Sequence, residues 1–146
     1  MTESNPPLNI LLIEDNQDHV RILKWAFEQS RRRTVLRFLR DGEEAMEEFK
    51  AGAEGKASIP DLIFLDFNLP RVDGRKVLRM LKADPVLKLI PVIILSSSDR
   101  PEDVQMAYDL GANTYVSKSV VLGELSTILQ DILDYWTRIA KLPNRR

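Results

Sequence analysis

Short apolar runs alternate along the chain with longer segments in which apolar residues recur every three or four positions. The short runs predict strands that are buried on both faces, because nearly every position in them is apolar. We expect five such strands, the second of them shorter than the first: Leu8–Ile13, Val35–Leu39, Leu62–Leu65, Val92–Leu95 and Thr114–Val116.

The segments between the strands have the spacing of amphipathic helices. After the first strand, Val20, Leu23, Ala26 and Phe27 would share one helix face. The other expected helices are Glu43–Ala53, a helix opened by Asp73-Gly74 and stopped before Pro85, Asp99–Gly111 with the glycine as its cap, and Val121 to about Lys141.

Repeated alternation of strand and helix predicts an α/β fold, a doubly wound five-stranded parallel sheet with helices on both faces. The two common doubly wound strand orders place ligands beyond the carboxyl ends of the strands, where the order reverses. In the order 2-1-3-4-5, the first and third strands are neighbours at that reversal. The pattern alone leaves the choice between the two orders open.

Length and composition narrow the classes of protein further. A chain of 146 residues with a net charge of −1 indicates one globular domain without general affinity for nucleic acid. It has no cysteine and a single histidine, His19, so thiolate and multi-histidine metal sites are excluded. We interpret His19 as an exposed helix residue rather than a ligand. Since neither a membrane-spanning stretch nor a secretory signal is present, we expect a cytoplasmic protein with no DNA or membrane partner.

Carboxylates follow two strands that would be neighbours in the order 2-1-3-4-5. The first strand ends on Glu14 and Asp15, and the third ends on Asp66. Carboxylates gathered in one crevice repel one another unless a cation or a proton neutralises part of their charge. Oxygen ligands without sulfur or histidine favour Mg²⁺, with Mn²⁺ or Ca²⁺ as substitutes. The sequence therefore predicts a divalent cation site at this edge of the sheet.

The next two strand ends would add a hydroxyl, Ser96, and an ammonium, Lys118, to the same crevice. A metal, a hydroxyl and a lysine suit phosphoryl transfer, whose transition state spreads charge over three oxygens. Asp66 could then be a nucleophile that forms an acyl phosphate. Taken singly, these residues also have structural interpretations: Glu14-Asp15 as a helix N-cap, Asp66 as a turn residue, Ser96 as a helix cap and Lys118 as a solvated side chain.

Four stretches in this order resemble the receiver domain of two-component response regulators: ILLIEDN, DLIFLDFNLPRVDG, PVIILSSSD and LGANTYVSKS. The resemblance covers about residues 8 to 135. It implies a flavodoxin-like (βα)5 fold with the strand order 2-1-3-4-5 and an extended last helix. We assign residues 1–7 to an N-terminal tail, 8–141 to the receiver domain and 142–146 to a C-terminal tail.

The resemblance implies a phosphoacceptor and a metal site. Asp66 corresponds to the phosphoacceptor aspartate, which also contacts Mg²⁺. Asp15 matches the direct metal ligand, Glu14 matches its acidic partner acting through water, and Asn68 matches the position whose backbone carbonyl completes the site. Glu14 departs from the family, which more often has aspartate there.

The resemblance also assigns residues to the phosphoryl group. Ser96 takes the hydroxyl position that turns toward the phosphate, Lys118 matches the lysine that pairs with the phosphoryl oxygens, and Tyr115 matches the aromatic switch. Ser119 follows Lys118 where the family typically has a proline after a cis bond. Because a cis bond before a non-proline residue costs about 2.5–4 kcal/mol, we expect this loop to be either trans and rearranged or strained.

The last helix carries more apolar residues than one stripe against a sheet requires. We expect the excess, especially Trp136 and Ile139, to be exposed in a monomer and to form a symmetric homodimer. The alternative is that the helix end folds back on its own domain. The predicted contact residues are Leu125, Ile132, Trp136 and Ile139.

The implied function is that of a single-domain response regulator rather than an enzyme acting on external substrates. A sensor histidine kinase would donate a phosphoryl group to Asp66 in a Mg²⁺-dependent reaction, and slow hydrolysis would follow. The signal would be a change of conformation or assembly. The tail DYWTRIAKLP resembles the C-terminal extension of single-domain regulators that pair with bacterial phytochrome kinases, so a bacterial phytochrome is the candidate partner.

Three alternatives remain open at this point. The first is a receiver-shaped interaction module that is never phosphorylated. The second is a phosphatase of the haloacid-dehalogenase type, which would need an acid where the chain has Asn68. The third is a flavodoxin-like mononucleotide binder, which would need a Ser/Thr/Gly-rich phosphate loop where the chain has the acidic stretch EDNQDH.

Overall fold

Five parallel strands form a single sheet in the order β2-β1-β3-β4-β5 in the computed structural model. The structure describes residues 6–118 and 125–143, with the backbone alone at 125 and 126. The predicted strand order is confirmed. The strands are β1 (Leu8–Ile13), β2 (Thr34–Leu39), β3 (Leu62–Leu65), β4 (Val92–Ser96) and β5 (Thr114–Ser117).

The edge strand β2 differs from its prediction. It begins at Thr34 and pairs along its whole length with β1, from Leu8 opposite Thr34 to Ile13 opposite Leu39. The two strands are therefore equally long, and the expectation of a shorter second strand is wrong. The apolar pattern misses Thr34 because this residue is polar, although its branched Cβ suits a pleated, half-exposed edge.

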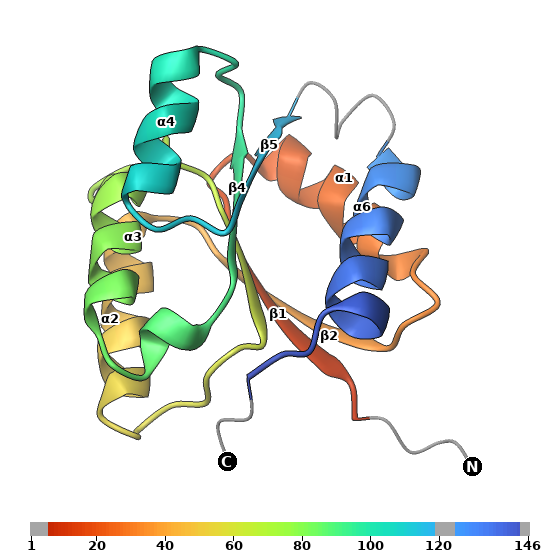
Figure 1. Cartoon of the computed structure of the whole chain (residues 1–146), viewed down its shortest axis with the longest axis horizontal. Coiled ribbons are helices and arrows are strands. Elements are labelled where there is room, and N and C mark those ends of the chain that lie inside the picture. Colours follow the sequence, from red (N-terminus) through yellow and green to blue (C-terminus); the bar gives the residue numbers. More distant parts are fainter. Residues whose placement is uncertain (1–5, 119–124, 144–146) are drawn as a thin grey trace.

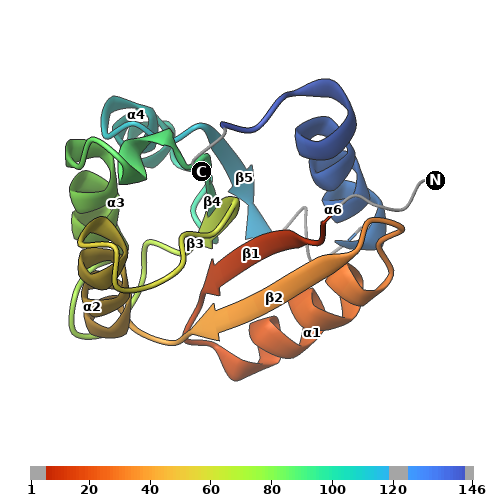
Figure 2. The ribbon, with the colours of Figure 1, turned by 90° about the horizontal axis from the view of Figure 1, so that it is seen from below.

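Helices cover both faces of the sheet (Figure 1). The first three begin behind aspartate or asparagine N-caps whose side chains accept backbone N–H bonds, namely Asn16, Asp41 and Asp73. α1 and α6 lie on one face, and α2, α3 and α4 lie on the other (Figure 2). The helices are α1 (Gln17–Glu28), α2 (Gly42–Ala53), α3 (Gly74–Ala83), α4 (Pro101–Asp109) and α6 (Leu125–Asp134), with a 3₁₀ turn, η1 (Leu87–Leu89), before β4.

The helix before β5 is shorter than predicted. α4 begins at Pro101. A proline is favoured in the first helical turn, because the N–H that it lacks would have no partner within the helix there. At the other end Gly111 has a φ of 103° and follows the helix as its cap, as predicted.

The core has two parts, one on each side of the sheet. β1, β3 and β4 are almost fully buried and contribute side chains to both parts. On the α1 and α6 side, Phe27 packs edge to face against Phe64 with ring centroids 5.3 Å apart. This arrangement leaves the strand ends as the place where polar side chains meet.

The end of the last helix differs most from the prediction. After α6 the chain makes a π-helical turn, η2 (Tyr135–Ile139), and Leu142 then packs against the core. Trp136 also packs against the core and is only partly exposed, so the expectation of an exposed Trp136 is wrong. Ile139 is 73% exposed, as predicted. Residues 121–124 of the expected helix lie outside the described residues.

Within the part of the chain that the structure describes, no helix combines the length and the hydrophobicity needed to cross a bilayer.

Candidate functional site

Three carboxylates meet beyond the carboxyl ends of β1 and β3. Glu14, Asp15 and Asp66 each offer one oxygen, and these oxygens lie within 4.8 Å of one another. The pairing of β1 with β3 brings these residues together, because the N–H of Asp66 donates to the carbonyl of Ile13 at 3.1 Å and so aligns the two strand ends. Glu14 and Asp66 are buried, whereas Asp15 is exposed. The predicted acidic cluster is therefore present.

A buried lysine from a third strand reaches this cluster. Lys118 directly follows β5, two strands away from β3, or about 10 Å at the usual strand spacing. Its Nζ lies 3.0 Å from Asp66 Oδ2 and 2.6 Å from Glu14 Oε1. The side chain therefore spans the end of β4, and its interpretation as a solvated lysine is wrong.

The charges in this cluster influence one another. Burial by itself lowers the pKa of Lys118, but the contacts with Glu14 and Asp66 outweigh burial and place it above the ordinary lysine value. Lys118 is therefore an ammonium at neutral pH. Burial raises the pKa of Glu14, the charge of Asp66 adds to this, and the contact with Lys118 opposes it. The ammonium of Lys118 thus neutralises only part of the negative charge of the carboxylates in this cluster.

The loop after β3 holds Asp66 in place. Asp66 Oδ1 accepts a hydrogen bond from the N–H of Asn68 at 3.1 Å, so Asp66 does take part in a turn. Gly74 packs against the same backbone, because a Cβ there would lie 2.3 Å from the carbonyl oxygen of Asp66. Its N–H donates to the carbonyl of Phe67 at 2.9 Å. These contacts fix the loop that carries the aspartate.

Two other predicted residues, at the end of β4 and in β5, both contact Ser98 in the loop after β4. Ser96 is buried and its Oγ accepts the N–H of Ser98 at 3.1 Å. The hydroxyl of Tyr115 donates to the carbonyl of Ser98 at 2.7 Å. Ser98 is therefore the common partner of the predicted hydroxyl residue and the predicted aromatic switch.

The structural interpretations of the remaining single residues are also wrong. α1 is capped by Asn16, so Glu14-Asp15 is not its N-cap. Ser96 is the last residue of β4, and α4 begins only at Pro101, behind Arg100. These polar residues are therefore not explained by helix ends.

The interpretation of His19 as an exposed helix residue is wrong, because His19 is mostly buried beside Lys118. His19 lies in the first turn of α1 with 24% of its side chain exposed, and its Nδ1 is 3.2 Å from Lys118 Nζ. A sequence signal was available, since Asn16 is a favourable N-cap and the first turn of a helix that follows β1 starts beside the strand ends.

The residues present suit a hard divalent cation. The contact of Glu14 Oε1 with Lys118 is an ion pair rather than a directed hydrogen bond, because Oε1 has no hydrogen-bond partner among the described residues. Asp15 adds an exposed carboxylate at the mouth of the cluster. An all-oxygen set with one open side is the kind of site that Mg²⁺ or Mn²⁺ takes in proteins.

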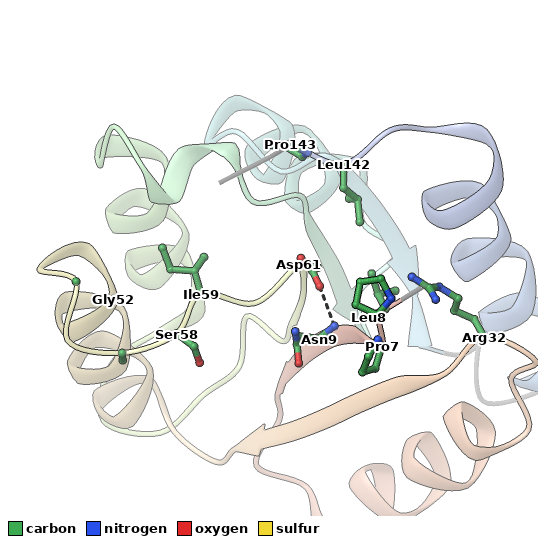
Figure 3. A pocket seen from close by; sticks show the side chains of 13 residues that line it. Pro7, Leu8, Asn9, Arg32, Gly52, Ser58, Ile59, Asp61, Leu142 and Pro143 are labelled. Carbon is green, nitrogen blue, oxygen red and sulfur yellow. Dashed lines mark hydrogen bonds between the residues drawn. The ribbon is translucent and has the colours of Figure 1, made fainter. Parts of the chain in front are cut away.

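A cavity of about 490 Å³ lies at the opposite end of the sheet, and Figure 3 shows its lining. It lies around the start of β1 and the segment before β3, with Arg32 and Leu142 at its side. The one hydrogen bond drawn across it joins the N–H of Asn9 to Asp61 Oδ2 at 2.9 Å. Among the described residues that line this cavity, Asp61 is the one carboxylate, so they form no group of converging carboxylates.

Comparison with protein families decides the class of protein. The profile of the response regulator receiver domain matches residues 10–130. The chain belongs to this family. The match covers both strand ends that carry the carboxylates and also the end of β5 with Lys118. Neither a flavodoxin nor a phosphatase of the haloacid-dehalogenase type is favoured.

Individual relatives agree with the family. The response regulator Rcp1 of Synechocystis is 41% identical over 97% of this chain and 97% of its own length. The crystal structure of the phosphorylated cyanobacterial phytochrome response regulator RcpA has a TM-score of 0.86 at 41% identity, covering 95% of this chain and 100% of that one. The Mn²⁺-bound form of Rcp1 has a TM-score of 0.84 at 38% identity, covering 94% and 100%. The receiver fold is thus shared along nearly the whole chain.

Proposed function

We propose that this response regulator accepts a phosphoryl group on Asp66 from a sensor histidine kinase, in a Mg²⁺-dependent reaction. The observation that carries the proposal is the position of Asp66, which is buried beside two further carboxylates and held at 3.0 Å by Lys118. A buried, ion-paired aspartate within a cation site is placed to act as a nucleophile toward a phosphoryl group.

Four residues would hold the metal: Asp15 and Asp66 as direct carboxylate ligands, Glu14 through water, and Asn68 through its backbone carbonyl. Bound Mg²⁺ would neutralise the carboxylates and the oxygens of the transferring group. Mn²⁺ or Ca²⁺ could substitute, since both accept oxygen ligands. The Mn²⁺-bound structure of the relative Rcp1 supports this assignment.

The transfer forms one bond and breaks one. A carboxylate oxygen of Asp66 attacks the phosphorus, the new P–O bond forms as the P–N bond of the kinase phosphohistidine breaks, and the histidine leaves. Lys118 remains charged throughout and balances the negative oxygens. Ser96 adds a hydroxyl donor from the neighbouring strand end.

The return reaction is slow hydrolysis of the acyl phosphate. Water attacks the phosphorus, inorganic phosphate leaves, and the Asp66 carboxylate is restored. Turnover of external phosphate esters is not expected, because Asn68 stands where a phosphatase of the haloacid-dehalogenase type would place its general acid.

Ser96 and Tyr115 would carry the signal away from Asp66. Both contact Ser98, at its N–H and its carbonyl respectively, so a shift of the Ser96 hydroxyl toward a phosphoryl group disturbs the bond made by Tyr115. A new charge that moves one partner of a connected pair can shift a two-state element in this way. The geometry of the Lys118–Ser119 bond, which we expected to be unusual, lies outside the described residues.

The proposed kinase is a bacterial phytochrome in the cytoplasm. Support comes from RcpA, a phytochrome response regulator, and from RtBRR, a bacteriophytochrome response regulator that is 30% identical with a TM-score of 0.73. We further propose that residues 8–141 form the receiver domain, between short tails at 1–7 and 142–146.

A homodimer through the last helix is also proposed, on a smaller surface than the sequence predicts. Tyr135 is 48% and Ile139 is 73% exposed, whereas Ile132 and Trp136 already pack against the core. The side chain of Leu125 lies outside the described part of the chain. The contact would therefore centre on Tyr135 and Ile139, with Ile132 and Trp136 at its margin.

The deciding experiment is intact-mass analysis after incubation with acetyl phosphate and Mg²⁺, followed by gel filtration of the same sample. We expect the parent protein to gain the mass of one phosphoryl group and Asp66→Asn to gain none. Equal labelling of the two proteins would show that Asp66 is not the acceptor. Absence of labelling in the parent would instead favour an interaction module that is never phosphorylated. A monomer at micromolar concentration with and without label would exclude the homodimer.

A further inference from the structure

The ammonium of Lys118 has three polar partners at the site. An ammonium group carries three N–H donors and no acceptor. Lys118 Nζ donates a hydrogen bond to Asp66 Oδ2 at 3.0 Å and forms an ion pair with Glu14 Oε1 at 2.6 Å, and His19 Nδ1 lies 3.2 Å from the same nitrogen. The histidine comes from α1, whereas the other two partners follow β1 and β3. The third partner therefore ties Lys118 to a helix in addition to the two strand ends.

His19 is itself held by a closed circuit of contacts. Glu14 Oε2 accepts the N–H of Asn16 at 3.1 Å, and Asn16 Oδ1 accepts the N–H of His19 at 3.1 Å. The circuit returns through His19 Nδ1 and Lys118 Nζ to Glu14 Oε1. The backbone around His19 is thereby tied to the strand end that carries the acidic cluster.

The chemistry of the pair determines which group donates. Because an ammonium can only donate, Nδ1 must accept, and the ring must be the neutral form with its proton on Nε2. Burial lowers the pKa of His19, and the charge of Lys118 lowers it further, which agrees with a neutral ring. Glu14 Oε2, at 3.9 Å from Nδ1, is too far to compete for a hydrogen bond.

We propose that His19 is a positioning residue for phosphoryl transfer, acting through Lys118. A lysine has a long, flexible stem, and its ammonium turns toward water unless its donors have fixed partners. His19 supplies such a partner at the side of the cluster that faces α1, and so it keeps Nζ directed at Asp66. This inference rests on the proposed phosphorylation of Asp66.

The test compares variants of the full chain by the rate of labelling with acetyl phosphate and Mg²⁺. His19→Leu removes the acceptor, His19→Gln keeps an acceptor oxygen, and Arg21→Leu is the matched control on the same helix, where Arg21 is 77% exposed. We expect His19→Leu to slow labelling about tenfold, because a small loss of positioning has large effects on rate. His19→Gln should stay within about twofold of the parent, and Arg21→Leu should match it. His19→Ala is a second variant without an acceptor, should leucine disturb the fold.

A double variant separates positioning from a general effect on the fold. In the background Lys118→Ala, His19→Leu should have no further effect on the labelling rate, since the residue through which it acts is gone. Three results would overturn the inference: parental labelling by both His19→Leu and His19→Ala, loss of labelling in His19→Gln equal to that in His19→Leu, or an undiminished effect without Lys118. An unlabelled parent would remove the proposed function and this inference together. A labelled parent with equally labelled His19→Leu and His19→Ala would remove the inference alone.

Discussion

The two ends of the sheet differ in kind: charged side chains converge at the carboxyl ends of the strands, whereas a cavity lies at the amino ends. At the carboxyl ends, three carboxylates and one lysine lie close together. All of them are buried except Asp15. At the amino ends there is a cavity of about 490 Å³, large enough for a small ligand. Asp61, the one carboxylate among the described residues of its lining, accepts the N–H of Asn9, which belongs to β1.

The difference lies in what the polar groups do at each end. Asp61 joins two backbone segments, so its position is explained by the fold. Glu14 at the other end is buried with an oxygen that lacks a hydrogen-bond partner among the described residues, and burial raises its pKa. Convergent charges that the fold does not need are better evidence of function than the volume of a cavity. The following changes test this comparison, from the largest expected effect to the smallest.

The sharpest test exchanges one aspartate at each end for asparagine. Asp66→Asn should abolish labelling by acetyl phosphate, because an amide oxygen cannot form a stable acyl phosphate, while Asp61→Asn should be labelled at the parental rate. Intact-mass analysis measures both. Loss of labelling in Asp61→Asn, with its thermal unfolding unchanged, would mean that the amino end takes part in the reaction and that the comparison is wrong.

Removal of the exposed carboxylate tests whether the acidic cluster is a metal site. Asp15→Ala should weaken Mg²⁺ binding and slow labelling about 100-fold, as loss of groups around a metal typically does. The measurement is the labelling rate as a function of Mg²⁺ concentration. An unchanged half-saturating Mg²⁺ concentration would contradict a direct role of Asp15 in binding the ion.

Replacement of the buried lysine tests how strongly the cluster depends on its ammonium. Lys118→Met leaves Glu14 and Asp66 buried without a cation, so we expect a loss of about 3 kcal/mol in the free energy of unfolding. Mg²⁺ should restore part of this loss by binding the folded state. Denaturant titrations with and without Mg²⁺ measure both effects. Arg32→Met at the amino end is the control and should change stability by no more than about 0.5 kcal/mol.

A pair of glycines compares the backbone at the two ends. Gly74→Ala would place a Cβ 2.3 Å from the carbonyl oxygen of Asp66, and such overpacking should cost about 2 kcal/mol and slow labelling. Gly55 lies beside the amino-end cavity with a φ of 75° and open space around it, so Gly55→Ala should cost about 1 kcal/mol through backbone strain alone. Its labelling rate should equal that of the parent. Slower labelling by Gly55→Ala would show that the two ends are coupled.

The smallest expected effect concerns a charge that lies near the carboxyl ends but outside the cluster. Asp41 caps α2 by accepting the N–H of Glu44 at 2.8 Å and pairs with Arg71, and these contacts lower its pKa. Because the folded-state pKa is below that of the unfolded chain, the stabilisation by this carboxylate is present above the unfolded value and is lost as the pH falls through the folded value.

Asp41→Asn keeps the capping oxygen but removes the charge. We expect it to lower the melting temperature by about 2 °C at pH 7. The difference from the parent should vanish at a pH below both pKa values, while labelling at pH 7 is unchanged. Thermal unfolding at the two pH values measures it, and a difference that persists in acid would mean that the charge is not its cause.

Much of the site was predictable because it depends on backbone geometry. Parallel strands aligned by their apolar runs bring their carboxyl ends to one edge, so Glu14, Asp15 and Asp66 had to meet once the strand order was known. The strand order itself came from the resemblance, since the apolar pattern fits both common doubly wound orders. The metal chemistry then followed from the residue types alone.

Other contacts depend on where long side chains reach, and the sequence does not determine this. His19 has the spacing of a surface helix residue, yet the placement of α1 against the sheet brings its ring to Lys118. Ser98 lay in a run of three serines with nothing to mark it as the partner of Tyr115. Trp136 looked like an excess apolar residue, but a π-helical turn brings it onto the core.

The sequence by itself determined which residues form the buried strands and that acidic side chains stand at the ends of two of them, because local apolar periodicity and residue type are properties of short segments. The tertiary structure decided which long side chains meet across those segments: that Lys118 bridges Glu14 and Asp66, and that His19 joins it. Side chains of this length can reach several neighbours, and only the packing of helices on the sheet selects one of them.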